Sequence, residues 1–180
     1  MIKTLTTRLN ALKKVSVNAN FKTRMMVANC CFMSIIIYMI SVWGGTEEYV
    51  VRTLQIMQNK TVRCVTKQSW FTPTKRLPLQ CNWLSIKQLI FLYTALQIWR
   101  VQTTKIPAYI DTKLQLSKTR SAAQGTLRVP LAEKSVESKS FMVRSAVVWN
   151  EIPADIRNCK TLGVFKKNLK EWIKVNVEIS

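Results

Sequence analysis

The sequence predicts a mainly α-helical fold of two packed helical subdomains, with a loop-rich insert and at most a short strand near residues 126–129. Apolar residues recur at helical intervals through most of the chain. Helix start and stop signals separate these stretches, and only Thr126–Val129 alternates as a strand would. With 48% apolar and 21% charged residues in 180, the chain can bury a core of its own.

The stretch from Met25 to Trp43 contains no charged residue and decides how the rest is arranged. It is long enough to cross a bilayer, and it could equally be the central helix of a bundle. Three polar residues inside it argue against lipid, namely Asn29, Ser34 and Ser41. Two basic residues before it favour a membrane span, namely Lys22 and Arg24. Because other apolar helices need a core, we expect this stretch to be buried in the protein.

The N-terminal half predicts three helices. Residues 3–15 have apolar positions at helical spacing, and a long helix from about 21 to 42 follows. We expect it to end at Gly44 and Gly45 in a left-handed C-cap. Thr46 should then cap a helix that runs to about Lys67. The domains are expected at 1–70 and 83–180, joined by a proline-containing connector at 71–82.

The C-terminal half predicts further helices around an irregular insert. Ser85 and Gln88 form a capping-box pattern that opens a helix to about residue 102. A short helical piece should follow Pro107, and residues 115–140 should be mostly loop. The pattern predicts two more helices, at 141–150 and from 162 to about 175.

The charge is the unusual feature of the composition. The chain has 28 Lys and Arg against 9 Asp and Glu, a net charge of +19, and its first acidic residue is Glu47. This excess is larger than solubility requires. We therefore expect a polyanionic partner, nucleic acid in the first place and an anionic membrane surface in the second.

Two rows of basic residues are the candidate nucleic-acid-binding residues. They lie opposite the apolar sides of their predicted helices: Lys60, Arg63 and Lys67 in the first row, and Lys166, Lys167, Lys170 and Lys174 in the second. The alternative is that each row is only the solvated face of an amphipathic helix. Most tryptophans fit core patterns, whereas Trp70, in the connector region beside Phe71, could stack on a base.

The residues of catalysis are scarce. There is no histidine, and Asp111 and Asp155 are the only aspartates, each isolated, which leaves no paired carboxylates for two magnesium ions. The glycines form no phosphate loop. The five cysteines contain no CxxC pair, so we expect buried, reduced thiols rather than zinc. The sequence therefore predicts no enzyme activity, no cofactor and no metal.

The order of several segments resembles the region after the polymerase palm in reverse transcriptases of non-LTR, LINE-type retrotransposons. The segments are Tyr38–Gly44 (YMISVWG), Leu54–Lys60 (LQIMQNK), Trp83–Ile86 (WLSI), Ile106–Ile110 (IPAYI), Thr119 with Arg120, Leu127–Pro130 (LRVP), Ser140–Arg157 (SFMVRSAVVWNEIPADIR) and Phe165–Ile173 (FKKNLKEWI). Together they are distributed along almost the entire chain, and WNEIPADIR is the most specific, although leucine is more usual than Ile152 before the proline.

The resemblance implies thumb-like helices that grip RNA or a DNA/RNA primer-template with weak sequence selectivity. The family's catalytic motif, tyrosine-x-aspartate-aspartate, belongs to the palm, so the resemblance carries no polymerase activity onto this chain, and a palm domain would be supplied elsewhere. The expected function is non-catalytic nucleic-acid binding in the nucleus or cytoplasm. The alternatives are a single-pass, membrane-anchored basic protein spanning at 25–43 and a protein-interaction module.

Overall fold

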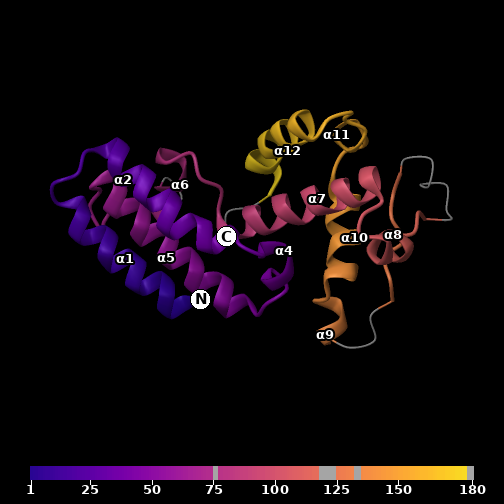
Figure 1. Ribbon diagram of the computed structural model, residues 1–180, viewed down its shortest axis with the longest axis horizontal. Coiled ribbons are helices and arrows are strands. Elements are labelled where there is room, and N and C mark those ends of the chain that lie inside the picture. Colours follow the sequence, from indigo (N-terminus) through magenta and orange to yellow (C-terminus); the bar gives the residue numbers. More distant parts are fainter. Residues whose placement is uncertain (75–76, 118–124, 132–134, 178–180) are drawn as a thin grey trace. The chain divides into compact units, whose positions relative to one another are not determined.

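The computed structural model describes residues 1–74, 77–117, 125–131 and 135–177 (Figure 1). In these residues the structure is helical, and the only β-pairing is one antiparallel bridge between Leu116 and Leu127. The predicted mainly α fold is confirmed. The chain forms two compact units, the first from 1–40 and 46–89 and the second from 41–45 and 90 onward, so the division falls within the helix α7 (Ile86–Thr104).

The first unit is built around the helix α5 (Glu48–Thr66). Helices α1 (Ile2–Ser16) and α2 (Phe21–Ala28) both pack against α5 and contact each other. Helix α1 buries the apolar row that its spacing predicted, made of Leu5, Leu9 and Leu12. A short helix, α6 (Leu77–Gln80), also contacts α5, so most of the predicted connector belongs to this unit.

The apolar stretch 25–43 is not the single, fully buried helix that its sequence predicted. It consists of the end of α2, a π-helix (Asn29–Met33), α3 (Ser34–Ile37) and α4 (Ile40–Trp43). The break falls at Met39, whose φ of 54° is left-handed. One side of the stretch is buried, including Ala28, Phe32, Met33, Ile36 and Ile40, whereas Met26, Tyr38, Met39 and Val42 are exposed. The π-turn adds a residue to the helical register and re-aims the side chains that follow.

The glycines after this stretch have a different role from the predicted one. Neither Gly44 nor Gly45 has a positive φ. At Gly45 the requirement is space, because a Cβ there would collide with the carbonyl oxygen of Lys139 and approach Nη1 of Arg144 to 3.3 Å. The side chain of Arg144 also donates from Nη2 to the carbonyl of Ser41. Glycine is therefore needed for close approach of two chain segments.

Helix α5 begins one residue later than predicted, since Glu47 and not Thr46 occupies the N-cap position. It ends as predicted, with Lys67 in the left-handed C-cap conformation at φ 56°. A buried polar network joins α5 to the start of α7. Gln58 donates to the carbonyl of Leu84 at 2.9 Å, and Oε1 of Gln55 accepts from the backbone N–H of Ile86 at 2.8 Å.

The capping box that opens α7 is confirmed by two hydrogen bonds. The Gln88 side chain accepts from the backbone N–H of Ser85 at 3.0 Å, and the Ser85 hydroxyl accepts from that of Gln88 at 3.3 Å. In the second unit, α7 carries part of an aromatic core. Trp99 stacks on Phe165 with ring centroids 5.8 Å apart, and Trp149 contacts the same ring at 6.1 Å.

The other helices of the second unit are α8 (Ala108–Lys113), α9 (Ser135–Ser138), α10 (Phe141–Glu151), α11 (Ala154–Arg157) and α12 (Leu162–Asn176). Helices α8, α10 and α12 match predicted ones, whereas α9 lies in the predicted loop and α11 was not predicted. The strand expected near 126–129 is reduced to the bridge at Leu127. The Asn150 side chain makes the two hydrogen bonds that a paired strand would make there. Its Oδ1 accepts from the N–H of Leu127 at 2.8 Å, and its Nδ2 donates to the C=O of Leu127 at 2.8 Å.

Candidate nucleic-acid interface

The first predicted basic row lines an open groove of about 660 Å³ between α1 and the C-terminal half of α5. The groove is lined by Lys13, Ser16, Lys60, Arg63, Cys64, Lys67, Gln68 and Trp70. Lys60 and Lys67 are exposed and Arg63 is half-buried. The structure thus brings all three predicted residues of this row to one site and adds Lys13 from a second helix.

Trp70 forms one end of this groove, and its position depends on Arg63. The guanidinium carbon of Arg63 lies 4.9 Å from the centre of the Trp70 ring, a cation–π contact. The same guanidinium donates from Nη2 to the carbonyl of Thr72 at 3.2 Å, which holds the turn after α5 against the helix. Trp70 is nevertheless 67% exposed, which confirms the expectation that it lies outside the core.

The groove is positively charged without a compensating acid. Among the described residues, no acidic side chain lines the groove and no salt bridge involves its four cations. Like charges on one concave surface raise the local concentration of anions. Because Arg63 and Trp70 are fixed by their contacts, the groove offers both a cationic wall and an aromatic face.

Sequence reasoning missed Lys13 and the way the groove forms. Lys13 lies in the last turn of α1, outside the row of leucines that α1 buries. Its position on the polar side of an amphipathic helix was readable from the sequence. The packing of α1 against α5, which places Lys13 opposite Lys60, Arg63 and Lys67, was not.

The second predicted row lies on α12 in the other unit. Lys166, Lys167 and Lys174 are exposed and Lys170 is half-buried. Burial lowers the pKa of Lys170, and repulsion from Lys174 and Lys166 lowers it further, so these ammonium groups are close together. The buried side of α12 is the predicted one and consists of Phe165, Leu169 and Ile173. This row lies on a helix face rather than in a groove.

Neither of the two aspartates is among the residues of the groove or of the α12 row. Asp111 pairs with Lys105, with 3.2 Å between Nζ and Oδ1, and Asp155 is exposed on α11. Among the described residues no three His, Cys, Asp or Glu side chains are grouped as metal ligands. The predicted burial of the cysteines holds for Cys81 alone, since Cys30 is exposed and the others are half-buried. Burial raises the pKa of the Cys81 thiol to about 11.

In the described part of the chain, no helix combines the length and the apolar character that crossing a membrane requires. Comparison of the chain with models of protein families, with curated proteins and with solved structures finds no match. The resemblance to the post-palm region of LINE-type reverse transcriptases therefore stays a prediction from the sequence. The features that bear on function are the groove and the basic face of α12.

Proposed function

We propose that this protein is a non-catalytic nucleic-acid-binding module and that the groove between α1 and α5 is its principal binding surface. The observation that carries the proposal is the combination of four cations and an exposed tryptophan in one groove without an acid. Lysine and arginine neutralise phosphates, and aromatic rings stack on bases. A merely solvated helix face would not need a second helix to complete it.

The spacing of the cations suits a phosphate backbone. Lys60 and Arg63 are three residues apart on α5, about 4.5 Å along the helix axis, and Lys67 follows at the left-handed C-cap of the same helix. Three cations that follow one another along α5 and its C-cap can neutralise neighbouring phosphates of one strand. Lys13 approaches from α1 and provides a contact from the opposite wall.

Trp70 favours a ligand with accessible bases. Single-stranded RNA and the unpaired template of a primer-template both present such bases, whereas a closed duplex buries its stacking faces. We therefore propose RNA or a primer-template as the ligand. Its sequence selectivity is weak, because phosphate contacts and stacking do not read the edges of bases.

The basic face of α12 supplies a second contact with phosphates. Lys166, Lys170 and Lys174 are close enough to lower the pKa of the central ammonium group, and a polyanion relieves this repulsion. In the function that the sequence resemblance implies, both surfaces hold the nucleic acid next to a palm domain supplied elsewhere. Such a role places the protein in the nucleus or cytoplasm.

A salt titration of RNA and primer-template binding tests the proposal. If four to seven of the seven predicted side chains engage phosphates, affinity should fall by roughly two to four orders of magnitude between 50 and 200 mM salt. An unrelated domain of equal net charge is the control. Binding no tighter than that of the control would refute the proposal.

The two alternatives predict other behaviour. A membrane-anchored protein would stay with membranes in high salt and alkaline carbonate, whereas we expect this protein to be extracted. A protein-interaction module would bind its partner with little dependence on salt. Template-dependent and magnesium-dependent nucleotide incorporation by the pure protein would contradict the non-catalytic role.

A further inference from the structure

The second unit contains a pocket of about 280 Å³ that the proposed nucleic-acid interface does not use. Polar groups from three parts of the chain meet in it. They are Gln102 and Lys105 at the end of α7, Asp111 on α8, and Arg157 and Asn158 at the end of α11. Trp149 of α10 forms part of the apolar wall.

Arg157 is the unusual group in this pocket, because it is a cation that is only 9% exposed. Its Nη1 donates to the carbonyl of Gly125 at 3.1 Å, and that oxygen also accepts from the Trp149 indole at 3.0 Å. Its Nε is buried and has no hydrogen-bond partner. No carboxylate of the described residues lies within 4 Å of the guanidinium. A buried cation without a counter-charge beside it is costly, and burial lowers the pKa of Arg157.

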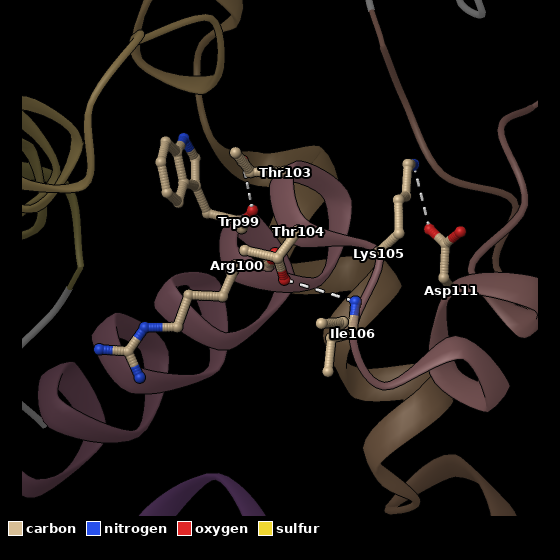
Figure 2. Close-up of polar contacts among 7 residues, drawn as sticks. All are labelled: Trp99, Arg100, Thr103, Thr104, Lys105, Ile106 and Asp111. Atoms are coloured by element: carbon tan, nitrogen blue, oxygen red, sulfur yellow. Dashed lines mark hydrogen bonds and ion pairs between the residues drawn. The ribbon is translucent and has the colours of Figure 1, made fainter.

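The one acid that lines the pocket is already paired. Figure 2 shows the Lys105 side chain directed at Asp111, with 3.2 Å between Nζ and Oδ1, while Arg100 extends away from this pair. Lys105 and Asp111 cancel each other, and the pocket keeps the positive charge of Arg157. The amides of Gln102 and Asn158 add neutral donors.

We infer that this pocket binds a phosphate monoester, with the guanidinium of Arg157 as its principal contact. A guanidinium is a planar fork of donors that matches the oxygens of a phosphate, and a bound phosphate would supply the missing counter-charge. The pocket is larger than a bare phosphate ion, so it has room for part of the group that carries the ester. The ligand is either a free mononucleotide or the phosphorylated end of a strand.

Nuclear magnetic resonance of the intact chain tests this inference. The Trp149 indole N–H shares its acceptor with Arg157, so its signal, assigned with Trp149→Phe, reports on the pocket. Titration with inorganic phosphate and with adenosine monophosphate at constant ionic strength should shift this signal to saturation, with a Kd below about 1 mM for one of them. A signal that stays unchanged, or that moves without saturation as general salt would move it, overturns the inference.

Two variants separate ligand binding from folding. Arg157→Lys keeps the charge but not the fork and should weaken binding about tenfold or more. Because Arg157 also holds Gly125, the variant must keep the amide spectrum of the folded chain. Lys105→Gln frees the carboxylate of Asp111 in the pocket and should also weaken binding, whereas the exposed Lys160→Gln should not. Equal affinity in the parent and in both pocket variants would refute the site.

The source of the phosphate is decided by a third comparison. An oligonucleotide with a 5′-phosphate is compared with the same oligonucleotide ending in a 5′-hydroxyl, so that the contribution of the basic groove cancels. A preference for the phosphorylated form that is lost in Arg157→Lys identifies a strand end. Saturable binding of the mononucleotide with no such preference identifies a free nucleotide. If the protein shows neither a preference for the 5′-phosphate nor saturable binding of the mononucleotide, it binds no phosphate monoester and the inference is overturned.

Discussion

Removing the four cations of the groove should abolish most of the salt dependence that this surface contributes. The change replaces Lys13, Lys60, Arg63 and Lys67 with glutamine, which removes the charge and keeps a polar side chain. Each phosphate contact contributes a slope of about 0.7 in log affinity against log salt for a single strand and about 0.9 for a duplex. Four contacts give slopes of about 2.8 and 3.6, or losses of roughly 50-fold and 150-fold between 50 and 200 mM salt.

Fluorescence anisotropy with a labelled single-stranded RNA and a labelled primer-template measures both slopes. The parent should show at least these slopes, and the variant should lack them while keeping the helical circular dichroism of the parent. A charge-matched control replaces the same residue types at exposed positions outside the groove and outside the α12 row, namely Lys3, Arg8, Lys22 and Lys160.

The expected loss of slope depends on where the charges lie and not on how many there are. If the control variant loses as much slope as the groove variant, the protein binds through its net charge of +19, and the groove has no special role. Arg63 also holds the turn at Thr72, so the quadruple variant could lose its fold. In that case a triple variant that replaces only the three lysines is measured instead. Unchanged binding in a folded triple variant would refute the groove.

The remaining predictions concern single features. Trp70→Ala should weaken the binding of single-stranded RNA by about 1–3 kcal/mol and the binding of a blunt duplex much less, measured in the same anisotropy assay. Equal losses of binding free energy would exclude base stacking. Gln58→Ala should lower the free energy of unfolding in urea by about 1–3 kcal/mol, because the buried carbonyl of Leu84 loses its donor, and a smaller change would mean that this bond is dispensable. At pH 8, iodoacetamide should label Cys81 much more slowly than the exposed Cys30, because burial raises the pKa of the Cys81 thiol from 9.0 to about 11 and leaves less thiolate; mass spectrometry of the peptides measures the two rates, and similar rates would contradict the burial. Glutamine should replace the four lysines of the α12 row, namely Lys166, Lys167, Lys170 and Lys174. This variant should bind all sequences about equally more weakly and show a flatter salt slope without unfolding. Unchanged affinity would exclude this row from the interface.

The fold class and most of the helices could be predicted from local signals in the sequence. Helix formation depends on residues three and four positions apart and on caps within one turn, which a single sequence displays. The capping box of Ser85 and Gln88 is such a local signal. The basic rows on α5 and α12 were readable for the same reason.

Only the tertiary structure decided how the apolar stretch 25–43 is divided and which residues meet in the groove. The break at Met39 and the π-turn before it contradict the local apolar pattern, and Gly45 is needed for the approach of Lys139 rather than for its own φ. Lys13 lies forty-seven positions before Lys60, and Trp149 and Arg157 meet at the carbonyl of Gly125. Such meetings depend on packing between distant segments, and no periodicity along the chain encodes them.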